Sequence, residues 1–269
     1  SSTNINNGST DNCGIDTITV SPTNFTCANT GSNAVILTVT DTYGNARTCS
    51  ANVTVIDSIL PVAICRNVTA QLDGNGQFSL SASLVDNSSF DNCSISSMVV
   101  SPSSFGCGQI GGNAVTLTVT DPNGLQRSCT ATVTVFDTLA PLPVCVNDTF
   151  ALNPAGSFAL TVPDIASGST DNCAISSSNL SQSSFTCADL GANSVMVTFS
   201  DASGNSSSCS VVVTIVDTTS PNAVCLNDTL YLDGAGAATL LVSQVNDGSS
   251  DACGIDTISL SVNTLTCAM

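Results

Sequence analysis

The sequence contains no lysine, glutamate, histidine or tryptophan, and its only cationic side chains are Arg47, Arg66 and Arg127. Nucleic acids and anionic membrane surfaces are bound through basic patches that neutralise phosphates or lipid headgroups. With 20 aspartates against 3 arginines, the chain has no such patch, and its charge attracts cations instead. We therefore expect no nucleic-acid partner and no membrane insertion of this segment.

The missing residue types also argue against catalysis and against sugar binding. Acid–base catalysis relies mostly on histidine, glutamate and lysine, and the aspartates that remain are copied from repeat to repeat. We therefore expect no enzyme and no catalytic residue. Sugar sites use aromatic platforms, but Tyr43 and Tyr231 stand at non-equivalent positions and there is no tryptophan. Direct sugar binding is therefore disfavoured, and a ligand-binding module of a secreted protein, for carbohydrate or protein, is kept only as the alternative function.

The chain has no CxxC pair and no apolar run long enough to span a membrane, but it has 14 cysteines. Without histidine or closely paired thiols to hold a metal, this number of cysteines indicates disulfides, which persist in oxidising compartments. The sequence therefore predicts an extracellular or cell-surface location. It shows neither a signal peptide nor an initiating methionine, so we expect a mature fragment of a longer protein.

The cysteines recur with a period of 80 residues. From Cys13 to Cys267 the successive gaps are 14, 22, 16 and 28 residues, repeated without any insertion. Such fixed spacing is the signature of a tandem array. The expected repeats, numbered first to fourth, are a partial one at 1–57, complete ones at 58–137 and 138–217, and a partial one at 218–269.

Apolar and polar residues alternate within each repeat, which is typical of strands. "AVTLTVTD" at 114–121 and "ATVTVFD" at 131–137 flank a turn, and further strands are expected at 62–72, 76–85 and 94–101. No stretch shows sustained helical spacing. Several short strands per repeat predict an all-β fold of tandem immunoglobulin-like β-sandwich domains in a rod-like array.

One repeat carries the pattern of a known family. It opens with "DSILPVAIC" at 57–65, continues through "DNC" at 91–93 and "VTLTVTDPNG" at 115–124, and ends with "CTATVTVFD" at 129–137. This pattern resembles the hyalin repeat, or HYR domain, and its particular form is similar to arrays in very large surface adhesins of Bacteroidota. The resemblance covers the whole chain and implies an extracellular adhesion or filament protein.

Four cysteines in a repeat allow three pairings within that repeat. The first and last strands of a sandwich run parallel as neighbours, which favours Cys65–Cys129 and Cys145–Cys209. Cys49 with Cys65 is disfavoured, because about eight extended residues separate Cys49 from the linker alone. The other cysteines are then expected to close short loops, as Cys13–Cys27, Cys93–Cys107, Cys173–Cys187 and Cys253–Cys267. Each bridge is expected to be structural and to contribute about 2–4 kcal/mol.

The same strand order predicts that acids gather where one domain meets the next. Asp91 lies in the loop before Cys93, Asp121 opens the hairpin turn, and Asp57 lies on the incoming linker. Aspartates with nearby carbonyl and amide oxygens suit Ca²⁺, although the alternative is that these residues only cap turns. The candidate calcium ligands are Asp11, Asp41, Asp57, Asp91, Asp121, Asp137, Asp171, Asp201, Asp217 and Asp251.

The resemblance to bacterial arrays also implies a modification. Aspartate followed by threonine or serine, and then by an aliphatic residue or threonine, is similar to an O-glycosylation signal of Bacteroidota. The candidate positions are Thr17, Ser58, Thr138, Thr218 and Thr229.

Together these features predict a structural and adhesive repeat segment of an extracellular surface fibre or giant adhesin. Disulfides, and Ca²⁺ as the one expected cofactor, would stiffen such a stalk or filament because neighbour contacts recur in an array of constant period. The expected partners are neighbouring repeats of the same chain, identical chains in a filament, and other cell surfaces or matrix reached by regions outside this segment.

Overall fold

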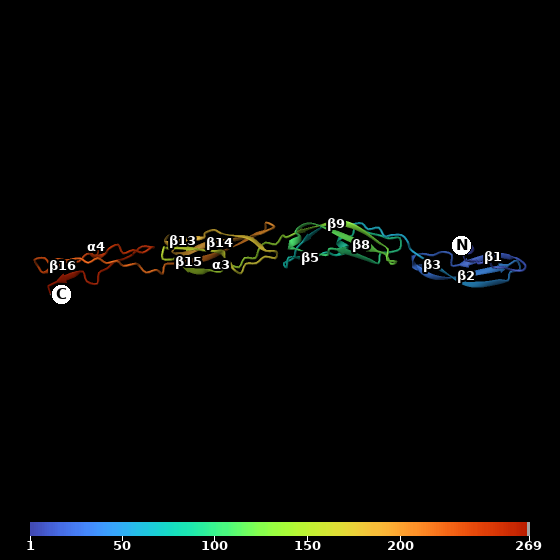
Figure 1. Ribbon diagram of the computed structural model, residues 1–269, viewed down its shortest axis with the longest axis horizontal. Coiled ribbons are helices and arrows are strands. Elements are labelled where there is room, and N and C mark those ends of the chain that lie inside the picture. The colour runs from blue at the N-terminus through green and yellow to red at the C-terminus, as the bar shows by residue number, and fades with distance from the viewer. Residues whose placement is uncertain (268–269) are drawn as a thin grey trace. The chain divides into compact units, whose positions relative to one another are not determined.

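The structure of the chain is a computed structural model that describes residues 1–267, and Figure 1 shows it as a ribbon. It separates into two compact units. Unit 1 comprises Ser1–Gln71 and Gln77–Phe136. Unit 2 comprises Leu72–Gly76 and the chain from Asp137 onward. By the 80-residue period, unit 1 contains the first repeat and most of the second, and unit 2 contains the third and fourth repeats together with residues 72–76 and Asp137 of the second.

Strands dominate both units, and the helices are turns of three to five residues. The elements of unit 1 are α1 (Ser2–Ile5), β1 (Ile15–Ser21), η1 (Cys27–Asn29), β2 (Gly31–Asp41), β3 (Ala46–Val55), β4 (Val68–Gln71), β5 (Gln77–Ser79), α2 (Ala82–Val85), β6 (Ser97–Ser101), β7 (Ser104–Gly106), η2 (Cys107–Gln109), β8 (Gly111–Thr120) and β9 (Gln126–Phe136). Those of unit 2 are β10 (Asp148–Ala151), β11 (Ser157–Ala159), α3 (Val162–Ala166), β12 (Ile175–Leu180), β13 (Ser184–Thr186), η3 (Cys187–Asp189), β14 (Gly191–Asp201), β15 (Ser206–Val216), β16 (Ala237–Thr239), α4 (Val242–Val245) and β17 (Thr264–Thr266).

Each complete repeat is a β-sandwich of a four-stranded and a two-stranded sheet. In the second repeat the larger sheet has the order β4-β9-β8-β6, and β5 pairs with β7. The third repeat has the same topology, with the order β10-β15-β14-β12 and the pair β11-β13. The first strand runs parallel to the last, with Val68 opposite Val133, while the other pairs are antiparallel. The chain is thus all-β, with the immunoglobulin-like sandwich that the sequence predicts.

The partial repeats contain fewer paired strands. The first repeat forms a three-stranded sheet of order β1-β2-β3, and in the described part of the fourth repeat β16 pairs with β17.

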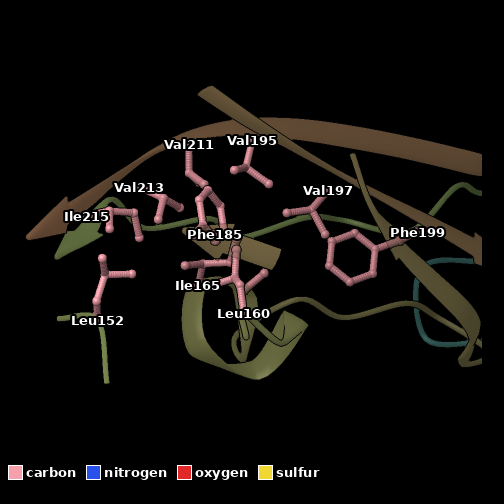
Figure 2. Packing of buried hydrophobic residues seen from close by; sticks show 11 residues of the cluster. Leu152, Leu160, Ile165, Phe185, Val195, Val197, Phe199, Val211, Val213 and Ile215 are labelled. Atoms are coloured by element: carbon pink, nitrogen blue, oxygen red, sulfur yellow. The ribbon is translucent and has the colours of Figure 1, made fainter. Parts of the chain in front are cut away.

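A hydrophobic core lies between the two sheets of each sandwich, and Figure 2 shows that of the third repeat. Successive side chains of a strand point to opposite faces, so alternate residues are buried. In the third repeat, the buried side chains of the larger sheet are Val195, Val197 and Phe199 of β14 and Val211, Val213 and Ile215 of β15. Phe185 of β13 and Ile165 of α3, both 0% exposed, face these side chains.

Two expected strands are shorter than the sequence predicts. The segment 76–85 contains the three-residue strand β5, and after Ser79 it finds no further partner strand. Backbone groups need hydrogen-bond partners, and the chain satisfies them by turning into α2, where the Asp86 N–H donates to the Ala82 carbonyl at 2.9 Å. Within 62–72, only β4 is a regular strand, while Val62 forms an isolated bridge with Phe90.

Candidate metal centre and repeat junctions

Two disulfides join the first and last strands of a complete repeat. Cys65 bonds Cys129, and Cys145 bonds Cys209, with Cα atoms 5.8 and 6.3 Å apart. These are the pairs that the sequence favours. The parallel pairing of β4 with β9, and of β10 with β15, brings each pair of cysteines together.

Two further disulfides join consecutive repeats. Cys27 of the first repeat bonds Cys93 of the second, and Cys187 of the third bonds Cys253 of the fourth. The predicted short loops were Cys13–Cys27, Cys93–Cys107, Cys173–Cys187 and Cys253–Cys267, and these pairings are wrong.

Strand direction explains why the short loops do not form. Ser97, at the start of β6, lies opposite Thr120 at the end of β8, whereas Cys107 precedes the start of β8. The ten residues of β8 span about 33 Å, while bonded cysteines need Cα atoms within about 7 Å. Cys93 and Cys107 are therefore at opposite ends of the sandwich.

The same geometry brings Cys27 to Cys93. Cys27 precedes Gly31, which lies opposite Val55 at the end where the chain leaves the first repeat. Cys93 follows Phe90, whose bridge to Val62 lies where the chain enters the second repeat. The sulfurs thus meet across the linker.

Of the remaining cysteines, two are bonded and four are not. Cys107 and Cys173 are disulfide-bonded, and they stand one period after Cys27 and Cys93. The free, exposed thiols are Cys13, Cys49, Cys225 and Cys267. The bridges above have sequence separations of 64 or 66 residues. For each free cysteine, the position that its partner would occupy by this pattern, 64 or 66 residues away, lies outside residues 1–269.

An acidic cluster, here called the third-repeat cluster, consists of Asp137, Asp171 and Asp201. One carboxylate oxygen from each lies within 4.8 Å of the others. Asp137 follows β9 on the linker, Asp171 lies in the loop before Cys173, and Asp201 ends β14. Asp137 and Asp201 are only 6% and 5% exposed. This grouping of linker, loop and hairpin acids is the arrangement expected from the sequence.

In both Asp137 and Asp171, one carboxylate oxygen accepts hydrogen bonds and the other accepts none. Asp137 Oδ1 accepts from the Leu139 N–H at 3.2 Å, and Asp171 Oδ2 accepts from the Cys173 N–H at 2.9 Å. Asp137 Oδ2 and Asp171 Oδ1 are buried without a hydrogen-bond partner. Leaving buried carboxylate oxygens unpaired is costly, and converging carboxylates repel one another. A bound divalent cation would remove both costs, so this donor set fits Ca²⁺.

Two asparagine side chains donate hydrogen bonds to the aspartates of the third-repeat cluster. Asn172 Nδ2 donates to Asp137 Oδ1 at 3.0 Å. Asn205 Nδ2 donates to the Asp137 carbonyl at 3.2 Å and to Asp201 Oδ2 at 2.8 Å. The role of Asn205 was not predicted, although the sequence has Asn45 at the equivalent position two periods earlier.

Asp201 is ionised at neutral pH in spite of its burial. Burial raises its pKa, but hydrogen bonds from the Asn205 side chain and from the backbone N–H groups of Asn205, Gly204 and Ser203 outweigh this effect. The net pKa of Asp201 lies below its ordinary value of 3.8. The cluster therefore carries negative charge at the pH where calcium would bind.

Related but smaller groups lie where the chain enters the second and the fourth repeats. Asp57 and Asp91 lie near Cys93, and Asp217 and Asp251 lie near Cys253. Both cysteines are in disulfides, so their sulfurs are not thiolate ligands. Asp91 Oδ1 and Asp251 Oδ2 are buried without a partner, as in the third-repeat cluster.

Three predicted ligands are not brought into such a group within residues 1–267. Asp121 is 1% exposed and its Oδ2 has no partner, but it is not grouped with Asp57 and Asp91. Leu125 stands where the third repeat has Asn205. Asp11 and Asp41 make turns instead, accepting from the N–H groups of Cys13 and Tyr43.

The candidate glycosylation positions are accessible. All five side chains are exposed, as a modification requires: Thr17, Ser58, Thr138, Thr218 and Thr229.

Comparison with known proteins gives one similar sequence and several solved structures matched at low TM-scores. The chain is 31% identical to hyalin from Strongylocentrotus purpuratus over 82% of its own length, and it spans 19% of that protein. No family model matches the chain. The repeats are thus hyalin-repeat-like, whereas a Bacteroidota source finds no support in these matches.

Among the solved structures that the chain matches, several are fragments of protocadherins, all at low TM-scores. The human protocadherin-24 EC1-2 fragment matches with a TM-score of 0.34 and 12% identity, covering 60% of this chain and 100% of that one. The protocadherin gammaB7 EC3-6 structure matches with a TM-score of 0.32 and 16% identity, covering 82% and 68%. Similarity at this level says nothing about the function of the chain.

Ten cysteines are in disulfides, and structural disulfides persist in oxidising compartments. Together with the similarity to hyalin, this shows an extracellular chain. Among the described residues, no helix has the length and apolar character needed to cross a bilayer.

Proposed function

We propose that the chain is a non-enzymatic, structural and adhesive repeat segment of an extracellular fibre or very large surface adhesin, stiffened by Ca²⁺. The third-repeat cluster is the observation that carries this proposal. Asp137 comes from the linker, whereas Asp171 comes from a loop and Asp201 from the end of β14 in the repeat that follows. A cation held by all three would fix the linker against that repeat. Fixed linkers make an array of constant period stiff, which suits a stalk or filament.

Calcium would bind through oxygen ligands on this chain. Asp137 Oδ2 and Asp171 Oδ1 are the partnerless oxygens that such an ion would use first. Ca²⁺ accepts six to eight oxygens in flexible geometry, so carboxylates, carbonyls and water suit it together. The groups around Asp57 with Asp91, and Asp217 with Asp251, are proposed as weaker sites because each offers two acids instead of three.

Calorimetric titration and thermal unfolding of the full chain test the calcium sites. Ligand binding to the folded state alone adds about 2.7 kcal/mol when its concentration is 100 times Kd. We expect millimolar CaCl₂ to raise Tm relative to EDTA in the parent chain. In the Asp137→Asn variant the calcium-dependent rise of the third repeat should disappear. Its Tm in EDTA should equal or exceed that of the parent, because one repelling charge is gone.

The matched control is Asp148→Asn, an exposed aspartate on β10 outside the cluster. This variant should keep the full calcium response. Equal Tm values in EDTA and calcium, with no heat of binding, would remove calcium from the proposal.

The fibre itself is tested on native material. Neighbouring repeats of the same chain, and identical chains in a filament, are the proposed partners, and other cell surfaces or matrix are proposed contacts of regions outside this segment. Electron microscopy should show beaded or rod-like filaments, whereas discrete globules would contradict the fibre. Intact-mass measurement should show added hexose if the five threonine and serine positions are O-glycosylated.

A further inference from the structure

We propose that the disulfides give each unit two independent covalent load paths, so that the two repeats of a unit stay joined when the linker between them is cut and a complete repeat keeps its length under tension. This inference goes beyond a structural role and does not require calcium. It follows from which cysteines are bonded and where the strands between them run.

The first path runs along the linker and through the bridge within a repeat. Tension that enters the second repeat reaches Cys65, crosses to Cys129, and leaves along β9. The residues from Cys129 to Phe136 already form an extended strand in the folded state. Because this segment is near its full length, pulling on it yields little extension. Cys145, Cys209 and β15 repeat the arrangement in the third repeat.

The loop that the disulfide within a repeat keeps out of this load path is long. Cys65 and Cys129 are 64 residues apart in sequence. An extended chain spans about 3.5 Å per residue, so this loop would release roughly 220 Å if its bridge were absent. With the bridge closed, only the stretches 57–65 and 129–137 carry tension. Unfolding a complete repeat therefore lengthens the oxidised chain very little.

The second path does not use the linker. In unit 1 it crosses from the first repeat to the second through Cys27–Cys93, and then follows β6 and β7 to Cys107, which is itself disulfide-bonded. In unit 2 the corresponding path runs from the bonded Cys173 along β12 and β13, and it crosses to the fourth repeat through Cys187–Cys253. Both stretches consist mainly of strands, so they too are near full extension.

The linker between the first and second repeats has exposed residues that a protease can reach. Ile56 is 74% exposed and Ile59 is 58% exposed. Exposed connecting segments without regular structure are preferred sites of proteolytic nicking. A second covalent connection would keep the two repeats of a nicked unit in one piece, which an extracellular tether needs and which a single linker does not provide.

Controlled cleavage of the linker tests the double connection. A specific protease site is inserted between Ser58 and Ile59 of the full chain, free thiols are blocked with N-ethylmaleimide, and the chain is cut. On a denaturing gel we expect one band without reductant and two fragments with reductant. In the double variant Cys27→Ser, Cys93→Ser the fragments should separate without reductant. Separation of the parent fragments without reductant would overturn the proposal.

Single-molecule pulling tests the constant length. The full chain is held at its termini in EDTA, so the result does not depend on the calcium sites. In the oxidised chain we expect no release approaching 220 Å, and after reduction we expect releases of about that size from the complete repeats. Releases of that size in the oxidised chain would overturn the load paths and leave the calcium proposal untouched.

Discussion

At the scale of single residues, a recurring glycine lies against a cysteine sulfur, which at Gly156 belongs to the disulfide Cys187–Cys253 that joins two repeats. Gly156 has φ +72°, and a Cβ built on it would lie 2.9 Å from Cys187 Sγ and 3.1 Å from the Ala252 Cβ. Its counterpart Gly236 would bring a Cβ to 2.6 Å from Cys267 Sγ. Glycine is therefore required at this turn for both its backbone angle and its close packing.

The Gly156→Ala substitution separates these two requirements. Gly204 also has positive φ, +92°, but a Cβ there meets nothing within 4 Å. We expect Gly204→Ala to lose about 1–2 kcal/mol from the backbone conformation alone. Gly156→Ala should lose more, because it adds the clash with the bridge. Urea denaturation measures both losses, and equal values would contradict the packing role.

Acid sensitivity is predicted for a helix start. The Thr161 hydroxyl and N–H donate to Asp164 Oδ2 at 2.6 and 2.7 Å and lower the pKa of Asp164 below its ordinary value of 3.8. A depressed pKa stabilises the fold above pH 3.8, and the benefit is lost as the pH falls through the folded-state value. Because Asp164 is exposed, the effect is less than about 1 kcal/mol.

The Asp164→Asn variant should accordingly have a lower Tm than the parent at neutral pH. This difference should close as the pH falls well below 3.8. Thermal scans across that range decide the matter, and a difference that stays constant with pH would rule out the carboxylate as its cause.

At the scale of elements, very short strands supply central parts of the core. β13 has three residues, yet its Phe185 is 0% exposed, and the ring lies 6.5 Å from that of Phe158 on β11. The sequence marks Phe185 only by its place two residues before Cys187. The pairing of β11 with β13 is what turns this side chain into the sandwich.

Truncating Phe185 should therefore destabilise unit 2 strongly. Loss of a buried phenylalanine ring and the cavity left behind cost about 3–5 kcal/mol. The control Phe136→Ala, at a ring that is 46% exposed, should cost much less. Denaturant unfolding followed by circular dichroism compares the two variants, and similar losses would contradict the assignment of Phe185 to the core.

At the scale of the whole molecule, whether a cysteine is bonded or free depends on its position in the array of repeats. Ten are in disulfides, and the free thiols Cys13, Cys49, Cys225 and Cys267 all lie in the partial repeats. With its bridges closed, the molecule is a set of sandwiches that are stapled internally and joined to their neighbours within each unit.

Alkylation of the unreduced, denatured chain should therefore add four labels, because only four thiols are free. Mass spectrometry counts the labels, and peptide mapping should then recover a peptide pair linked through Cys27 and Cys93. A linked pair of Cys93 with Cys107, or more than four labels, would contradict the observed connectivity.

Much of this molecule was predictable from the sequence. The period of 80 residues, the strand alternation in 114–121 and the surplus of aspartate are properties of neighbouring residues along one chain. They were enough for the all-β sandwich and for the bridge Cys65–Cys129, because strand order within one domain places both ends of that bridge.

Only the tertiary structure decided which groups meet across a junction. Cys93 bonds Cys27 rather than Cys107. The sequence predicts that linker, loop and hairpin acids gather at every junction, but within residues 1–267 the structure groups all three types only at Asp137, Asp171 and Asp201, whereas Asp121 is not grouped with Asp57 and Asp91. These contacts depend on which end of a sandwich each loop occupies and on how the linker leads into the next repeat. The sequence repeats the loops of Cys93 and Cys107 with the same spacing in every repeat and does not show which end of the sandwich each occupies. The strands between them hold the Cys93 loop near the junction with the preceding repeat and the Cys107 loop a full strand length away.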